Sequence, residues 1–467
     1  MTHLEGHLTR ADRARSHYAH LPFDVPAGVA ALRISLDHDP PGDADHPSVG
    51  AVLDLGLMGP GSLEIGTSAF RGWSGSERRT IVVGSRRATP GYRPGSIEPG
   101  RWHVILGLYA IPAEGCTYRV DVEVLADEPV ADSVPVSDAP TDPASPVARR
   151  PSATRRAGWV ACDLHAHTVH SDGSDDVATL ARRAGEAGIE VLFATDHNTD
   201  SHLPELAAAE LRSGVKVLPG EEITTYGGHL NAIGIRTWVD FRDPSTTGMR
   251  RALATIQAQG GLASVNHPCS DGSPWTLGAD LPFDLVEVWN GPCSPQNEAA
   301  LAWWMAIVAA GRRPTAVGGS DTHGRGAAEH PVGRPTTWIA TARADAPAVL
   351  EGLRAGRVVV TRDAAVAPPR LWARAAGGPI AEIGGTLTTA GSVEVGWDAP
   401  GHAGRSLAVK AAARTVVAIP VTSDRCAGTV VLEAEEAREA RFVRLEIREP
   451  DGDVVVLTNP IYLEGVR

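Results

Sequence analysis

The sequence predicts an α/β protein: a distorted parallel (β/α)7 barrel of the TIM type, flanked by N-terminal and C-terminal antiparallel β-sandwich-like domains. Three observations lead to this prediction. In the middle of the chain, short apolar runs alternate with segments of helical periodicity, which is typical of a parallel barrel. Several of these runs end in His, Asp or Glu, and reactive groups in such barrels lie at the carboxyl ends of the strands. Both flanks instead alternate with a period of two between glycines and prolines.

Residues 1–126 are expected to form the N-terminal β-sandwich-like domain. Alternating apolar and polar residues at 31–36, 103–109 and 117–124 predict strands there. Residues 127–157 are rich in proline, alanine and serine, which is typical of an extended linker. Arginine pairs near the end of this linker are read more simply as solvent-exposed charge than as a nucleic-acid patch.

Residues 158–362 are expected to form the barrel, and residues 363–467 the C-terminal β-sandwich-like domain. In the barrel, apolar runs lead into polar residues at 191–197, 215–222, 228–231, 262–268 and 315–323. Helices are predicted between them, at 177–187, 204–212, 249–259, 296–310 and 347–354. In the last domain, Asp451-Gly452 is a hairpin signal between two predicted strands.

The segment from Asp163 to Gly173 is the strongest local sign of function, because three histidines and two aspartates follow an apolar run. His165 and His167 are two positions apart, so in a strand both side chains project to the same face and can reach one metal ion. Such a pair is also common among ordinary histidines. The metal interpretation therefore depends on the His, Asp and Glu residues that end the later runs.

With these residues assembled, the chain resembles the PHP (polymerase and histidinol phosphatase) family of metallohydrolases, and within it the CehA/McbA branch related to carbaryl hydrolase. The resemblance covers residues 158–362. It rests on six motifs: HxHTxHSDG at 165–173, TDH at 195–197, GEE at 220–222, GH at 228–229, NHP at 266–268 and SDTH at 320–323. No ligand position of the family is lost, which argues against a degenerate structural domain.

The resemblance implies a centre of three divalent metal ions. Imidazole and carboxylate side chains would bind them at three positions: His165, His167 and Asp321; Glu222 as a bridge, with His229 and His267; and Asp172, His197 and His323. Glu222 is preferred to Glu221 because the acidic ligand of the family stands two residues after the glycine. The catalytic role falls to Glu222, Asp321 and His323. Asp196 is expected to orient a metal-binding histidine, and His170 to be a loop residue or an outer partner.

The expected ions are Zn, Mn or Fe, which the sequence does not rank, because imidazole and carboxylate ligands without thiolate suit all three. Two cations that share a carboxylate can bind a bridging water and lower its pKa, which gives a hydroxide nucleophile near neutral pH. The third cation would stabilise the negative charge that develops in the transition state.

The predicted reaction is hydrolysis of a phosphate mono- or diester of a small molecule or nucleotide, since three cations match the charge of a phosphoryl group. Arg325 and Arg334 follow the last ligands and are candidates to bind phosphate oxygens, or are ordinary surface arginines. The alternative is a carboxylic or carbamate ester hydrolase, with Trp275 and Trp289 lining an apolar pocket or packing in the barrel. A non-catalytic, metal-binding regulatory protein is disfavoured by the complete ligand set.

Charge and composition restrict the partners. The formal net charge of −13 disfavours nucleic acid and anionic membranes, although an exonuclease-like role stays open. No apolar run is long enough to span a bilayer and the start of the sequence lacks a secretion signal, so a cytoplasmic location is predicted. Five scattered cysteines indicate neither disulfides nor a thiolate zinc site. The β domains are candidates for contacts in a homo-oligomer.

Overall fold

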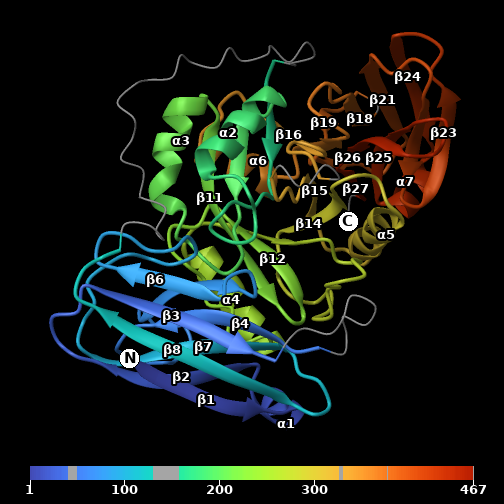
Figure 1. Cartoon of the computed structure of the whole chain (residues 1–467). Coiled ribbons are helices and arrows are strands. Elements are labelled where there is room, and N and C mark those ends of the chain that lie inside the picture. The colour runs from blue at the N-terminus through green and yellow to red at the C-terminus, as the bar shows by residue number, and fades with distance from the viewer. Residues whose placement is uncertain (40–49, 130–156, 325–329, 376, 466–467) are drawn as a thin grey trace.

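The computed structural model describes residues 1–39, 50–129, 157–324, 330–375 and 377–465 (Figure 1). In chain order it has an N-terminal part of β-strands, a central α/β part and a C-terminal part that is again mostly β. Most of the predicted linker, residues 127–157, lies outside the described residues. Within the described parts of the chain, no helix combines the length and the apolar character that crossing a membrane requires.

Two antiparallel sheets form the N-terminal part, with strand orders β1-β8-β3-β6 and β2-β7-β4-β5. Their elements are β1 (Thr2–Leu8), α1 (Arg10–Arg15), β2 (Tyr18–Val25), β3 (Ala31–His38), β4 (Val52–Met58), β5 (Phe70–Gly75), β6 (Thr80–Gly84), β7 (Gly100–Ala110) and β8 (Cys116–Leu125). Leu32 from one sheet and Leu55 and Val104 from the other belong to one buried core. The two sheets therefore pack face to face as a sandwich.

The central part combines strands and helices, as the sequence predicts, although some consecutive strands have no helix between them. Its strands are β9 (Trp159–Asp163), β10 (Val191–Ala194), β11 (Lys216–Thr225), β12 (Gly228–Ile233), β13 (Leu262–Val265), β14 (Leu285–Asn290), β15 (Thr315–Gly319), β16 (Thr336–Ala340) and β17 (Val358–Thr361). Its helices are α2 (Val177–Glu186), η1 (Leu203–Glu205), α3 (Leu206–Ser213), α4 (Thr246–Ala258), α5 (Pro295–Ala309) and α6 (Ala346–Arg354). Side chains of Asp176, Ser245, Ser294 and Asp345 cap the starts of α2, α4, α5 and α6.

The all-parallel, closed barrel of the prediction is not what the structure shows, because the central sheet is mixed. Strands β9, β10 and β11 are parallel neighbours, and so are β13, β14 and β15, but β12 is antiparallel to both β11 and β13. Only Tyr226 and Gly227 join β11 to β12, and two residues make a hairpin but not a parallel crossover. Between β9 and β15, the described residues form one isolated parallel bridge, Ala166 with Thr322, rather than a continuous ladder.

The C-terminal part continues the central sheet. Its elements are β18 (Arg370–Ala375), β19 (Ile380–Glu382), β20 (Thr386–Thr388), β21 (Val393–Pro400), β22 (Ser406–Ala411), β23 (Arg414–Pro420), β24 (Arg425–Leu432), α7 (Ala434–Ala440), β25 (Phe442–Arg448), β26 (Val454–Thr458) and β27 (Ile461–Glu464). β26 pairs with β17, and the predicted hairpin at Asp451-Gly452 is confirmed by the antiparallel pair β25–β26. A separate sheet, β19-β18-β21-β24, shares a buried core with this extension through Val395 and Leu445.

Arginine side chains of the N-terminal sandwich form hydrogen bonds and an ion pair with the central part. Arg78 donates to the backbone carbonyls of Ser171 (2.8 Å) and Val169 (2.6 Å), in the loop that follows β9. The guanidinium of Arg93 lies 2.6 Å from the carboxylate of Asp200. The sandwich thus restrains the loop in which the sequence places the first predicted ligands.

Candidate metal centre

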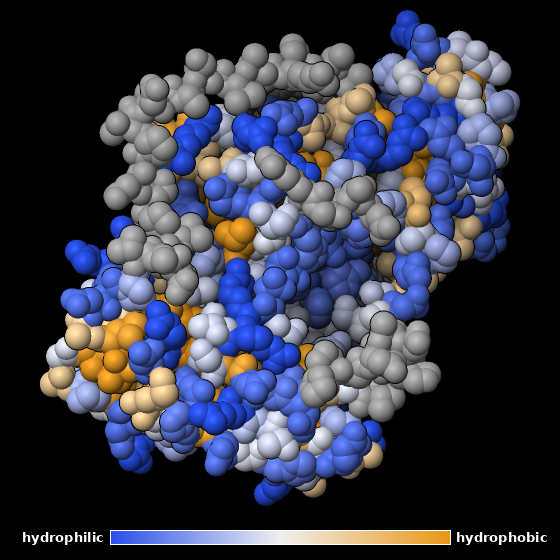
Figure 2. Space-filling model, viewed as in Figure 1, coloured by the Kyte–Doolittle hydropathy of each residue, from blue (hydrophilic) through white to orange (hydrophobic). Residues whose placement is uncertain are grey.

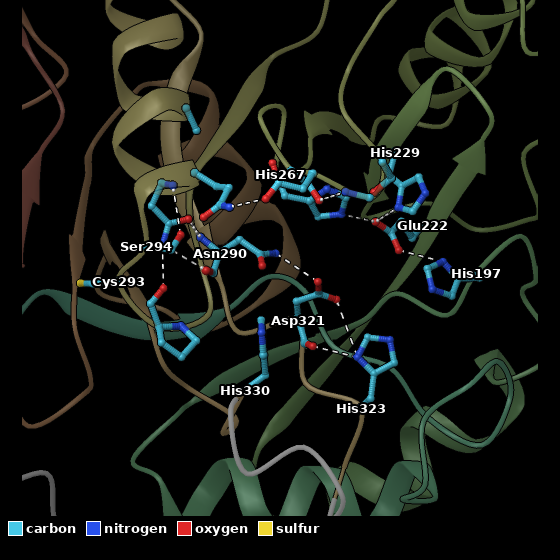
Figure 3. A pocket seen from close by; sticks show the side chains of 18 residues that line it. His197, Glu222, His229, His267, Asn290, Cys293, Ser294, Asp321, His323 and His330 are labelled. Carbon is cyan, nitrogen blue, oxygen red and sulfur yellow. Dashed lines mark hydrogen bonds and ion pairs between the residues drawn. The ribbon is translucent and has the colours of Figure 1, made fainter. Parts of the chain in front are cut away.

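The structure brings all the predicted ligands together at one end of the central sheet. We call this set the candidate metal centre: His165, His167, Asp172, His197, Glu222, His229, His267, Asp321 and His323. Most of them follow β9, β10, β13 or β15, as expected for strand ends. Glu222 and His229 instead lie inside the β11–β12 hairpin, opposite Asn231 and Thr224. In Figure 3 the ligands from the hairpin face Asp321 and His323 across one pocket.

Glu222 lies at the middle of the centre. Its side chain is 1% exposed, and its two carboxylate oxygens have imidazole nitrogens on several sides. The distances are 2.8 Å to His197, 3.2 Å to His229, 3.3 Å to His165, 3.4 Å to His267 and 3.5 Å to His167. The neighbouring Glu221 accepts a hydrogen bond from the backbone N–H of Val239 (2.8 Å) and forms no ion pair with these histidines among the described residues. The alternation of side chains along β11 therefore favours Glu222 as the bridging ligand.

Asp321, in the loop after β15, joins the same group. Its Oδ1 lies 3.0 Å from Nε2 of His167 and 3.2 Å from Nε2 of His165. Both Asp321 (φ 53°) and His267 (φ 28°) have left-handed backbone conformations. For residues other than glycine such conformations cost about 1–3 kcal/mol each and tend to occur at functional sites.

A further group forms around Asp172, in the loop after β9. Its Oδ1 lies 3.3 Å from Nε2 of His323, and its Oδ2 lies 3.6 Å from Nε2 of His197. Nδ1 of His167 is 4.0 Å from the same carboxylate. His167 thus stands between the group at Asp172 and the group at Glu222, a shared position that the motifs did not indicate.

The charges of the centre are tightly coupled. Burial would raise the pKa of Glu222, but the imidazoles of His165, His197 and His229 outweigh burial and hold that pKa well below its usual range. Burial would likewise lower the pKa of His165, but Asp321 and Glu222 hold it well above its usual range. The carboxylates are therefore ionised at neutral pH, and they require compensating positive charge close by.

The donor atoms fit divalent cations. Within each of three overlapping groups the donor atoms lie within 4.8 Å of one another. Nδ1 of His165 lies 3.0 Å from Oε1 of Glu287, which places the proton on Nδ1, because a carboxylate only accepts. Nε2 of His165 is buried and faces the carboxylates of Glu222 (3.3 Å) and Asp321 (3.2 Å), and in the neutral ring it would offer its lone pair to a cation there. Buried polar atoms of this kind are costly unless an ion occupies the space between them.

Sequence reasoning missed the residues that support the ligands. Besides holding His165, Glu287 accepts hydrogen bonds from the backbone N–H of His267 (3.0 Å) and from Asn290 (3.0 Å). Asn290 also donates to Asp321 (3.2 Å). Asn266 donates to Oε1 of Glu222 (2.8 Å). One signal was available, since Glu287 is the single carboxylate in the apolar run that forms β14.

Asp196 forms hydrogen bonds with the loop that follows β9. Its carboxylate accepts hydrogen bonds from the N–H and hydroxyl of Thr168 and from the hydroxyl of Ser171, each 2.8 Å long. The histidine beside it is His202, at 3.2 Å, which is not among the predicted ligands. Among the described residues, the contact of Asp196 with the predicted ligand His167 runs through Ser171, whose hydroxyl lies 3.5 Å from that ring, so its role toward a metal-binding imidazole stays a prediction.

Replacing Asp196 with alanine is expected to weaken metal retention about 10- to 100-fold, because the loop that carries Asp172 loses three hydrogen bonds. Metal content after dialysis against graded chelator measures this effect. Asp24→Asn, at an exposed position in β2, is the control. Retention equal to that of the unmodified protein would show that the loop holds its shape without Asp196.

The remaining candidates that the structure describes do not belong to the centre. Arg325 is outside the described residues. Arg334 is 60% exposed, and its guanidinium lies 3.8 Å from Asp363. Two cavities, described below, adjoin the centre, and Arg334 lines neither of them. His170 contacts Ser201 and Glu205 instead of the ligands. Trp275 and Trp289 are buried in the core and line neither cavity, in keeping with a packing role.

A polar cavity of about 860 Å³ lies beside the centre. Six of the ligands line it: His197, Glu222, His229, His267, Asp321 and His323. Its other walls are rich in hydrogen-bonding side chains: Ser270, Asn290, Ser294, Asn297 and His330. Figure 3 shows Asn290 and Ser294 facing the pocket beside the start of α5. Figure 2 shows that hydrophilic residues surround the hollow in the middle of this face, where β12 and β14 lie in Figure 1.

Known proteins share parts of this sequence, although no protein-family model matches it. The chain is 34% identical over 142 residues to the uncharacterised protein MJ1587 of Methanocaldococcus jannaschii, a match that covers 27% of this chain and 80% of that protein. It is 42% identical over 66 residues to a phosphoribosyl 1,2-cyclic phosphate 1,2-diphosphodiesterase of Eggerthella lenta, covering 14% of this chain and only 24% of that enzyme. Among solved structures, a two-domain protein of Bacteroides vulgatus containing a predicted PHP-like metal-dependent phosphoesterase aligns with a TM-score of 0.38 and 16% identity, over 65% of this chain and 95% of that chain.

Proposed function

This chain belongs to the same family as protein MJ1587, and we propose that it is a PHP-like, metal-dependent hydrolase that cleaves a phosphate mono- or diester of a small molecule or nucleotide. The observation that carries the proposal is the position of Glu222, whose carboxylate is buried among imidazoles from five histidines. Such a carboxylate can bridge two cations. The group around Asp172 supplies a third position.

Each part of the centre has a role in this reaction. Divalent ions bound there would lower the pKa of a water molecule and neutralise charge on a phosphoryl group. Glu287 fixes the proton of His165 on Nδ1 and keeps Nε2 directed into the centre. The backbone carbonyl of Asp321 does the same for His323, since it accepts from Nδ1 (2.9 Å). These hydrogen bonds orient both rings so that Nε2 faces the carboxylates of the centre, and a bound cation would take the place of the proton on Nε2.

The polar cavity supports a phosphate ester as the substrate. Ser270, Asn290 and Ser294 offer hydrogen bonds to phosphate or sugar oxygens next to Asp321. The relative from Eggerthella lenta is a phosphodiesterase by name, in keeping with this class of substrate. Trp275 and Trp289, the residues expected to line an apolar pocket for a carbamate ester, are buried in the core and line neither cavity beside the centre.

We propose that the centre binds three ions of Zn, Mn or Fe. We also propose domain boundaries after residues 126, 157 and 362, a cytoplasmic location, and a homo-oligomer formed through the β domains. The polar cavity beside the centre supports a small phosphorylated molecule as the substrate. The net charge of −13 argues against long nucleic acids as the main substrate.

Metal analysis combined with four substrates tests the proposal. The purified protein, loaded in turn with Zn, Mn and Fe, is assayed with p-nitrophenyl phosphate, bis-p-nitrophenyl phosphate, 1-naphthyl acetate and an aryl carbamate. We expect hydrolysis of at least one phosphate ester and loss of that activity on chelation. Cleavage of the acetate and carbamate, with neither phosphate ester cleaved, would favour the carboxylic ester hydrolase instead.

A further inference from the structure

A second cavity, of about 1040 Å³, adjoins the candidate metal centre on the side of the N-terminal sandwich. It shares Asp172, His197 and His229 with the centre. Its walls come from two distant parts of the chain. We call it the aromatic chamber and define it by six of its lining residues: Arg13, Tyr18, Asp54, Trp73, Tyr109 and Tyr226.

Tyr226 forms the middle of the aromatic wall. It occupies the two-residue turn between β11 and β12, so the same hairpin that carries Glu222 and His229 places this ring in the chamber. The ring of Tyr18 stacks on it, with centroids 5.9 Å apart and planes at 21°. The ring of Tyr109 lies 5.7 Å away at 58°. Aromatic pairs at such distances attract each other, and His17 also lies against Tyr226, with ring centroids 5.0 Å apart, so the open ring for a ligand is that of Tyr109.

Tyr109 has an exposed ring, which distinguishes it from the core aromatics. Its exposed fraction is 53%, compared with 5% for Tyr18 and 4% for Trp73. The guanidinium carbon of Arg13 lies 5.7 Å from the centroid of Tyr226 and adds a cation to the same wall. A planar group in the chamber would therefore meet an open aromatic face and a guanidinium together.

Asp54 gives the chamber one buried polar group. Its side chain is only 8% exposed, and its Oδ2 accepts a hydrogen bond from the hydroxyl of Tyr226 (3.1 Å). Among the described residues no Lys, Arg or His forms an ion pair with it. Burial raises the pKa of Asp54 to about 7, although the hydrogen bond from Tyr226 opposes this. A carboxyl group in this state can donate or accept a hydrogen bond, and such a group in an apolar wall fixes the orientation of a bound molecule.

We propose that the aromatic chamber binds a planar aromatic group of the substrate, a nucleobase or an aryl ring, while the ester phosphate lies at the metal centre. This inference rests on the proposed function. The chamber, of about 1040 Å³, has ample room for such a group together with the rest of a small substrate, and His197 and His229 connect the chamber directly to Glu222. The N-terminal sandwich, through Arg13, Asp54 and Tyr109, is then a determinant of substrate specificity.

The test compares substrates that differ only in the aromatic group. Benzyl phosphate is matched with cyclohexylmethyl phosphate, and adenosine 5′-phosphate with ribose 5-phosphate, so that the leaving alcohols within a pair are chemically similar. Because stacking on an aromatic side chain contributes enough for about a tenfold effect, we expect kcat/KM for the aromatic member to exceed that of its partner about tenfold or more in at least one pair. The pair that shows the preference identifies an aryl ring or a nucleobase.

Variants connect the preference to the chamber. Tyr109→Leu and Tyr226→Leu keep apolar bulk but remove the ring, and each is expected to reduce the ratio at least about fivefold with metal content unchanged. Tyr118→Ala, on β8 of the other sheet of the sandwich, is the control and should leave the ratio as it is. Ratios near one in both pairs for the unmodified protein, or ratios that survive both leucine variants, would overturn the inference.

A binding measurement separates this inference from the proposed function. Isothermal titration with adenosine against ribose, and with benzyl alcohol against cyclohexylmethanol, requires no hydrolysis. If no phosphate ester is cleaved but the aromatic compound of a pair still binds more tightly, and less so in Tyr109→Leu, then the chamber is supported and the phosphoesterase proposal is wrong. Equal binding within both pairs would contradict the chamber whatever the activity.

Discussion

Glu222→Gln is expected to remove most of the bound metal and to lower kcat/KM for phosphate esters by about 1,000-fold or more. Glutamine keeps the size of the side chain but lacks the negative charge, so it cannot balance the five imidazoles around this position or bridge two cations. Loss of bridged cations removes several kcal/mol of transition-state stabilisation, which corresponds to this factor. Elemental analysis and steady-state kinetics on the same preparation measure both effects.

Glu221→Gln is the matched control, since the two residues are adjacent in β11 and both are buried. Burial raises the pKa of Glu221 well above its usual range, so a neutral amide resembles the group already present. This variant should retain its metal and most of its activity. The roles of the two glutamates would be reversed if Glu221→Gln lost its metal and Glu222→Gln did not.

Asp172→Ala is expected to remove one equivalent of metal and to reduce kcat about 100-fold, while the other ions stay bound. Asp172 touches His197 and His323 but belongs to neither group that contains Glu222. The expected reduction in kcat is similar to the reduction seen when an enzyme loses one preorganised group that stabilises negative charge in the transition state. Metal stoichiometry before and after the substitution gives the direct measure.

His170→Ala tests whether the effect is specific, because this residue lies in the same loop and contacts Ser201 and Glu205 rather than the ligands. It should keep the full metal content. An Asp172→Ala protein with unchanged stoichiometry would mean that the group around Asp172 binds no ion of its own.

The candidate centre could be predicted because its ligands are marked by local sequence. His165 and His167 are two apart after an apolar run, and Asp321 and His323 repeat that arrangement after β15. Strand ends that meet at one edge of a sheet bring such residues together whatever the details of the packing. Side-chain alternation along a strand predicts that only one of Glu221 and Glu222 faces the centre, and the preference for Glu222 came from the resemblance to the PHP family.

The rest of the fold and of the site depends on loop lengths, backbone conformations and contacts between distant residues, which residue types alone do not reveal. The two-residue link at Tyr226 and Gly227 was in the sequence and should have predicted a hairpin instead of another parallel strand. The left-handed backbone at His267 and Asp321 had no such signal, because neither residue is a glycine. Contacts such as Arg78 with Ser171 join residues 93 positions apart, so the part played by the N-terminal sandwich became visible only in three dimensions.

The wide spacing of the ligands has a consequence for the order in which the protein matures. The first ligand, His165, and the last, His323, are separated by most of the central part. A nascent chain therefore cannot assemble the complete centre until β15 has left the ribosome and packed. The N-terminal sandwich is synthesised earlier, so Arg78 is already present when the loop after β9, to which it donates hydrogen bonds, is made. Binding of the proposed ions would therefore require that β15 has packed, and a chain that stops before Asp321 lacks two of the predicted ligands.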